Sequence, residues 1–155
     1  MTESPARSRF GTFINVMFGH DGRIGRLYFW LGMTATTAIT VFFGANAEGA
    51  TMGTGELGRY LAFFFIVGLL VWMHSAVIVK RLHDRNRGGL WYFAYGIAPL
   101  GFFLWAVYLH ASGELTGASL FYILSAIGIA WLVIELGLMR GTVGPNRFGP
   151  DPGDP

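Results

Sequence analysis

The sequence contains no cysteine and few charged residues, and both shortages narrow what the protein can be. Without cysteine, the chain cannot form disulfides, use a thiol in catalysis or ligate an iron–sulfur cluster. Charged residues make up 13% of the chain and hydrophobic residues 53%, whereas soluble domains carry about 25% charged residues. Because a water-exposed surface needs more charge than this, the composition indicates a membrane protein.

Motifs of familiar catalytic chemistry are also missing. The sequence has no nucleophile elbow, no phosphate-binding glycine loop and no zinc-ligand spacing such as HExxH. The loops between its apolar runs are too short to form a separate catalytic domain. We therefore expect a protein that is not an enzyme and that has no catalytic residues, metal or cofactor.

Four apolar runs cover residues 27–45, 60–79, 90–109 and 118–138. As helices rising ~1.5 Å per residue, runs of about 20 residues match a hydrocarbon core of ~30 Å. The runs lack the strict alternation of barrel strands and the polar stripe of soluble helices. They predict an all-α integral membrane protein, in which residues 21–139 form a four-transmembrane-helix bundle. No cleavable signal peptide is apparent ahead of the first run.

The basic residues predict the orientation of this bundle. Of the 11 Lys and Arg residues, all except Arg59 precede the first run, separate the second from the third, or follow the fourth. Basic flanks stay on the cytoplasmic side. We therefore expect a bacterial inner-membrane protein with both termini and residues 80–89 in the cytoplasm. The expected partners are the bilayer and its anionic headgroups at that face, and not nucleic acid.

The two ends of the chain have patterns of their own. Residues 1–20 are expected to form a cytoplasmic arm with a short amphipathic helix in the membrane interface, although a disordered arm is the alternative. Residues 140–155 form a cytoplasmic tail rich in Gly and Pro, which favour turns. The apolar face of the arm is predicted to consist of Phe10, Phe13, Ile14, Met17 and Phe18, with Asn15 opposite.

The segment KRLHDRNRGGLW, residues 80–91, embeds one acid among bases. If the second helix continues into it, Arg81 and Asp84 are three positions apart on one face. Asp84 can then accept hydrogen bonds from Arg81, or from Arg23 or Arg26 ahead of the first run. A ligand site built from the same residues and a solvated, unpaired loop are the alternatives.

Three ordered motifs carry a resemblance to a known family. They read GRIGRLYFW (22–30), RLHDRNRGGLWYF (81–93) and GTVGPNRFGPDP (141–152). Placed in this order around four spans, they resemble the small bacterial inner-membrane proteins grouped as DUF805. The resemblance implies the location and the fold, and it leaves the activity open because the function of that family is unknown.

All three motifs fall on the predicted cytoplasmic side, where the bundle is expected to close. The resemblance therefore adds the tail to the expected polar interactions at that face. The predicted cytoplasmic-face polar cluster consists of Arg23, Arg26, Arg81, Asp84 and Asn146.

Two ionisable residues, His74 and Glu135, lie within predicted spans. His74 precedes Lys80 by six residues and Glu135 precedes Arg140 by five, which places both ~8–9 Å inside the cytoplasmic boundary. Ionisable groups at such depth are functional candidates by default. One interpretation is an intramembrane polar pair between the second and fourth helices. The other is that Glu135 extends toward Arg140 while His74 bonds to a backbone carbonyl.

These features favour a non-enzymatic accessory or scaffold component of the membrane. One alternative is a small transporter or channel that uses His74 and Glu135. Four short helices enclose little space, so this alternative requires a homo-oligomer. A membrane protein that binds an anionic lipid or ligand is the other alternative, and a larger membrane complex is a further possible partner.

Overall fold

The computed structural model describes residues 9–46 and 55–153. The start of the predicted arm (residues 1–8), residues 47–54 and the last two residues lie outside this description. Within the described ranges the chain is helical and contains no β-strand, which confirms the all-α class. The elements are α1 (Arg9–Phe18), α2 (Arg26–Ala45), α4 (Glu56–Asp84), η1 (Gly89–Trp91), η2 (Phe93–Ile97), α5 (Ala98–Ala111), α6 (Leu115–Leu132) and η3 (Val133–Leu138).

Three helical segments are long and apolar enough to cross a membrane, judged by length and composition over the described residues. They are Glu56–Asp84, Gly89–Ala111 and Leu115–Leu138, and they contain the second, third and fourth predicted runs. The first predicted run is helical as α2, which is not among these three segments. Three candidate spans are therefore observed, and the fourth stays a prediction.

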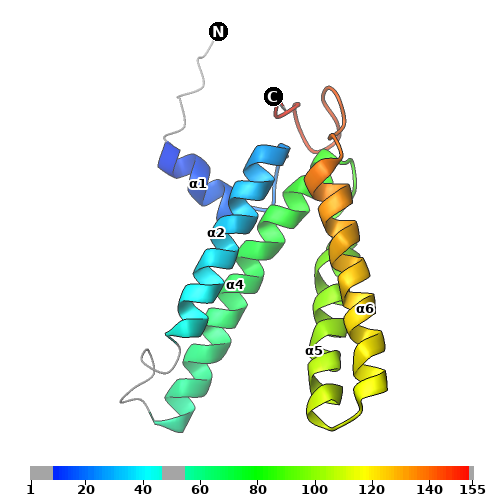
Figure 1. Ribbon diagram of the computed structural model, residues 1–155. Coiled ribbons are helices and arrows are strands. Elements are labelled where there is room, and N and C mark those ends of the chain that lie inside the picture. Colours follow the sequence, from blue (N-terminus) through cyan, green and yellow to red (C-terminus); the bar gives the residue numbers. More distant parts are fainter. Residues whose placement is uncertain (1–8, 47–54, 154–155) are drawn as a thin grey trace.

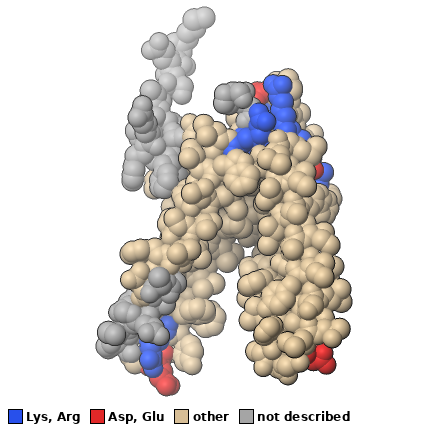
Figure 2. All heavy atoms as spheres, viewed as in Figure 1, with Lys and Arg blue, Asp and Glu red and all other residues tan. Residues whose placement is uncertain are grey.

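The helices form two antiparallel pairs, α2 with α4 and α5 with α6 (Figure 1). The pairs meet at one end, where the end of α4 contacts η1, η2 and η3, and they separate toward the other end. We call these the joined end and the open end. Figure 2 shows the space between the pairs widening toward the open end.

The buried core is concentrated at the joined end. Phe29 of α2, Ile78 and Leu82 of α4, Tyr95 of η2 and Leu136 of η3 are at most 1% exposed and pack in one cluster. Toward the open end, large apolar side chains such as those of residues 63–65 point outward. An apolar exterior of this kind suits helices surrounded by lipid rather than water.

Small residues allow the helices within each pair to approach closely. A Cβ added at Gly32 of α2 would lie 2.8 Å from Val77 Cγ2 of α4, and Thr36, one turn later, is also buried. In the other pair, a Cβ at Gly128 of α6 would lie 2.6 Å from Pro99 Cγ of α5. Contacts this close require glycine, because any larger residue would separate the helices.

Two helical segments at the joined end, η2 and η3, are π-helical. η2 lies just ahead of Pro99, whose ring clashes with the carbonyl four residues earlier and which lacks an N–H. The widened turn of η2 relieves this clash, so the helix accommodates Pro99 through a π-helical turn. Such π-helical turns often occur at functional sites.

The short helix predicted in the N-terminal arm is present as α1, but the position of Met17 differs from the prediction. Met17, assigned to the lipid-facing side, is 2% exposed and packs in the core. Lys80 Nζ of α4 donates to the Asn15 backbone oxygen and, at 2.9 Å, to Asn15 Oδ1. Trp72 Nε1 donates to the Phe18 carbonyl at 3.1 Å. These bonds satisfy carbonyls at the C-terminal end of α1, so α1 is anchored to α4 there. Its position in a membrane interface stays a prediction.

Candidate functional site at the joined end

The carboxylate of Asp84 lies between two arginines. Its Oδ1 accepts hydrogen bonds from Arg23 Nε (3.0 Å) and Nη2 (2.8 Å), and its Oδ2 accepts one from Arg81 Nη1. Arg81 lies one turn earlier in α4, and Arg23 reaches Asp84 from the segment before α2, just after Gly22, whose φ is +85°. All three side chains are at most 2% exposed. Charges this deeply buried require pairing and hydrogen bonds.

Arg81 also caps the end of the last helix. Its Nε donates to the carbonyl of Leu136 at 2.7 Å, and its Nη2 donates to that of Met139 at 2.7 Å. Carbonyls in the last turn of a helix lack partners within the helix, and that end carries partial negative charge. Arg81 therefore joins α4 to η3 through both hydrogen bonds and charge.

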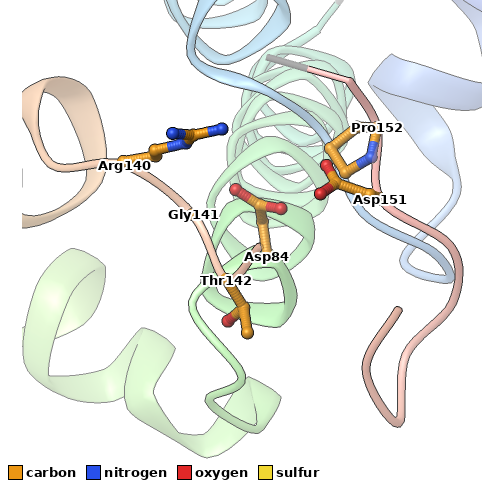
Figure 3. A pocket seen from close by; sticks show the side chains of 6 residues that line it. All are labelled: Asp84, Arg140, Gly141, Thr142, Asp151 and Pro152. Carbon is orange, nitrogen blue, oxygen red and sulfur yellow. The ribbon is translucent and has the colours of Figure 1, made fainter. Parts of the chain in front are cut away.

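Arg23 holds the tail in the same way. Its Nη1 donates to the carbonyl of Gly144 at 2.7 Å, and its Nη2 to that of Thr142 at 2.6 Å. The Thr142 N–H donates in turn to the Asp84 carbonyl at 2.8 Å. A Cβ at Gly141 would lie 1.9 Å from Asp84 Oδ2, so only glycine allows the tail to cross the carboxylate so closely (Figure 3).

Asn146 lies at the joined end but does not contact the carboxylate of Asp84 directly. Its Nδ2 donates to the carbonyl of His83 at 2.9 Å, which satisfies a carbonyl in the last turn of α4. The ring of Phe148 stacks on the ring of His83, with 3.9 Å between centroids. Arg26 is the first residue of α2, at this same end. The structure thus brings Arg23, Arg81 and Asp84 into direct contact, with Asn146 in the adjoining tail.

Glu135 belongs to a second cluster, whose members the sequence did not indicate. Its Oε1 accepts a hydrogen bond from Arg85 Nη2 at 3.0 Å, and Arg87 Nη2 lies 3.0 Å from the same oxygen. Arg87 Nη1 donates to Tyr95 Oη at 2.9 Å, and its guanidinium lies over the ring of Trp91 at 4.6 Å. The two π-helices therefore each supply a polar group that contacts Arg87, namely Tyr95 from η2 and Glu135 from η3.

His74 and Glu135, which one of the two interpretations paired within the membrane, do not contact each other in the structure. The structure records no hydrogen bond to the imidazole of His74 among the residues it describes, and Glu135 pairs with Arg85 and Arg87 instead. The chain turns after Asp84 and brings two guanidinium groups over η3. Two cations attract a carboxylate more strongly than a neutral imidazole does. The close spacing of Arg85 and Arg87 is the only sequence signal that pointed to this cluster.

The joined end offers little room for a substrate. A cavity of about 10 Å³ lies beside Asp84, lined also by Arg140, Gly141, Thr142, Asp151 and Pro152 (Figure 3). This volume holds about one water molecule. No group of three His, Asp or Glu side chains that could hold a metal ion occurs in the part of the chain that the structure describes.

Asp151 fixes the turn of the tail beside this cavity. Its Oδ2 accepts a hydrogen bond from the Gly144 N–H at 2.7 Å, and its Oδ1 accepts one from the Gly153 N–H at 3.1 Å. These two hydrogen bonds lower the pKa of the Asp151 carboxyl below its ordinary value, and the bond from Gly144 has the larger effect. Asp151 is therefore a charged acceptor that orders the tail from residue 144 to residue 153.

Comparisons with known proteins identify relatives of similar length. The uncharacterized protein YiiR of Escherichia coli (strain K12) is 31% identical over 150 residues, which cover 89% of this chain and 88% of YiiR. The inner membrane protein YhaH of the same strain is 27% identical over 136 residues, which cover 86% of this chain and 87% of YhaH. No solved structure matches the chain. The family model described as "Protein of unknown function (DUF805)" matches residues 17–150, so the resemblance of the three motifs is confirmed and the chain belongs to this family.

Proposed function

We propose that the chain is a small multi-pass protein of a bacterial inner membrane, with four transmembrane helices and both termini in the cytoplasm. The relative YhaH, described as an inner membrane protein, supports the location. α2 supports the fourth span because it is 20 residues long and packs along α4. Most of the visible Lys and Arg atoms gather at the joined end (Figure 2), which favours a cytoplasmic position for that end.

Within this membrane, the proposed role is that of a non-enzymatic accessory or scaffold component. One observation carries the proposal: the guanidinium groups of Arg23 and Arg81 bond to Asp84 and to carbonyls of their own chain. The predicted polar cluster therefore uses its charge to close the joined end. The adjacent cavity has room for about one water molecule, which is too little for a metabolite.

The open end supplies the surface that a scaffold needs. Phe64 and Phe65 of α4 are 68% and 72% exposed, and Ile123 and Ile127 of α6 are 58% and 60% exposed. Large apolar side chains at this depth contact either lipid tails or other membrane helices. A scaffold component would use part of this surface to bind the helices of a larger complex.

Transport through His74 and Glu135 receives less support. Glu135 is paired with two arginines, and it does not contact His74. A pathway lined by these two residues would require the Arg85 and Arg87 ion pairs to open first. The proposed partners remain the bilayer, its anionic headgroups at the joined end, and a membrane complex or homo-oligomer.

Photo-crosslinking in native membranes tests the scaffold role. A photoreactive side chain at Phe64 is expected to give a discrete adduct with another membrane protein, while the same group at buried Ser125 of α6 should give none. An adduct at Phe64 with only a second copy of the chain would favour the oligomeric transporter. If the photoreactive group labels only lipid, at Phe64 and at every other exposed position tested, the scaffold role is contradicted.

A further inference from the structure

Arg85 and Arg87 are compensated less fully than the buried arginines. Arg23 and Arg81 are at most 1% exposed and find several backbone carbonyls in addition to Asp84. The side chains of Arg85 and Arg87 are 20% and 31% exposed, and both pair with a single oxygen of Glu135. Two positive charges thus meet one negative charge at a site that the surroundings can reach.

Their hydrogen-bonding capacity is also unfilled. A guanidinium has five N–H donors. Among the described residues, Arg85 donates to Glu135 and to the carbonyl of Arg140, and it makes a long contact to the sulfur of Met139. Besides its ion pair with Glu135, Arg87 donates within the same part of the chain to Tyr95 Oη. Arg85 Nε is buried and has no acceptor among residues 9–46 and 55–153. The two side chains are partly exposed, and these contacts leave N–H groups of their guanidinium groups unused, although the buried Nε of Arg85 is not one that a ligand can reach.

The surface around this pair is apolar. Leu90 is 81% exposed and Trp91 44% exposed on one side, while Leu138 and Met139 on the other are 60% and 43% exposed. The guanidinium of Arg87 lies over the Trp91 ring, an arrangement typical of the boundary between hydrocarbon and headgroups. A ligand at this position would need a negatively charged group joined to apolar chains.

We propose that Arg85 and Arg87 bind the phosphate of an anionic phospholipid headgroup at the joined end. Guanidinium groups bind phosphate oxygens in bidentate geometry, and basic sites beside transmembrane helices accept lipid headgroups. A headgroup with net negative charge is preferred over a zwitterionic one, because an ammonium group would face the uncompensated positive charge. The inference rests on the proposed function in one respect, namely that the joined end lies in a membrane interface.

Glu135 gains a defined role under this proposal. It occupies one side of both guanidinium groups and holds them together, and it also competes with the lipid phosphate for their positive charge. Neutralising Glu135 therefore has the opposite effect to neutralising the arginines. This difference in sign separates a phosphate site from a cluster that only stabilises the fold.

Lipid retention by the full-length protein tests the site. The protein is reconstituted in nanodiscs of phosphatidylcholine with added phosphatidylglycerol, released into mild detergent and examined by native mass spectrometry. Arg85→Gln combined with Arg87→Gln is expected to lower phosphatidylglycerol retention about tenfold, equivalent to about 1.4 kcal/mol. Arg59→Gln, the matched control at the open end, should retain lipid like the wild type, and Glu135→Gln should retain more.

Several outcomes would overturn the proposal. The proposal is overturned if the wild type and the double variant retain phosphatidylglycerol equally. It is also overturned if Arg59→Gln loses as much lipid as the double variant, or if Glu135→Gln retains less lipid than the wild type. Melting temperatures establish which variants are folded. If the double variant does not fold, Arg85→Lys is used in its place. Lysine keeps the charge and loses the bidentate geometry, so reduced lipid retention is again expected.

Two further measurements identify the source of the phosphate and separate the lipid-binding proposal from the scaffold proposal. Added inorganic phosphate should not displace the bound lipid, and complete displacement would point to a soluble anion and overturn the assignment to a lipid. The retention experiment uses purified protein, so it does not depend on orientation in the cell or on protein partners. If crosslinking fails and lipid retention is intact, the scaffold role is rejected and the lipid site stands. If a crosslink forms and lipid retention does not depend on the arginines, the lipid site is rejected and the scaffold role stands.

Discussion

Arg23 and Asp84 are 61 residues apart in the sequence, and Arg23 Nη2 lies 2.8 Å from Asp84 Oδ1. This ion pair joins the segment before α2 to the last residue of α4. Through the other donors of Arg23 it also binds the tail after η3. A single carboxylate therefore organises three segments that the chain brings to the joined end from different helices.

Asp84→Asn is expected to destabilise the protein strongly. The change keeps the shape of the side chain but leaves Arg23 and Arg81 buried without their counter-charge, which costs about 3–5 kcal/mol for a buried pair. Thermal melting in mild detergent measures the loss, with the exposed acid Asp21→Asn as the control. Arg81→Ala should not add its full effect to that of Asp84→Asn, and additive, near-zero effects would mean that the cluster is solvated.

Gly141→Ala is expected to displace the tail from the end of α4. The added Cβ would lie 1.9 Å from Asp84 Oδ2, so either the tail or the carboxylate must move. Limited proteolysis should then cleave the tail faster, and the melting temperature should fall. Gly68→Ala in α4 is the matched control, since its Cβ meets no atom within 4 Å and alanine favours a helix by about 1 kcal/mol. Equal cleavage of the two variants would contradict the tight crossing.

Stability is expected to fall as the pH drops below about 6.5, the ordinary pKa of histidine, in part because of His20. Burial of the ring, and then the charge of Lys80, lower the pKa of His20, while Asp21 acts in the opposite direction. His20 lies in the connection before α2, where its Nε2 is 2.8 Å from Ser75 Oγ. A lowered pKa means that the unfolded chain takes up the proton first, so this contribution is present above the ordinary pKa and is lost on acidification.

The contribution of His20 is isolated by comparing wild type with His20→Asn across this pH range. Other histidines also titrate there, so the difference between the two melting curves is the quantity to measure. The variant should lose less stability on acidification than the wild type. Parallel curves would contradict the lowered pKa.

Glu135 is expected to be coupled energetically to Arg85 and not to His74. Glu135→Gln removes an ion-paired acceptor that is 8% exposed, at a cost of about 1–3 kcal/mol. A double-mutant cycle with Arg85→Gln should show strong non-additivity, whereas a cycle with His74→Gln should be additive. Coupling to His74 of the same size would restore the predicted intramembrane pair.

Reporter fusions test the orientation of the spans. Fusions at Gly113 and at Gly53, which lies outside the described residues, are expected to report a periplasmic position. Fusions at Gly88 and at the C-terminus are expected to report a cytoplasmic one, because the bases lie on that side. A periplasmic result at Gly88 would reverse the topology, and a cytoplasmic result at Gly53 would mean that α2 does not cross the membrane.

The sequence by itself determined the features that depend on composition and local spacing. Apolar runs of sufficient length specify helices because lipid leaves backbone groups no other partner. Helical spacing places Arg81 and Asp84 on one face, and the three motifs identify the family.

Only the tertiary structure decided which partner each polar group meets. Glu135 and His74 have similar depths along their helices, but the turn after Asp84 and the π-helix η3 bring Arg85 and Arg87 to Glu135 instead. Arg23 and Arg81 bind carbonyls, and because every residue has a carbonyl, no sequence pattern can single these out. A hydrophobic run specifies a helix through its own residues, whereas a hydrogen bond between distant segments depends on how the whole backbone brings them together.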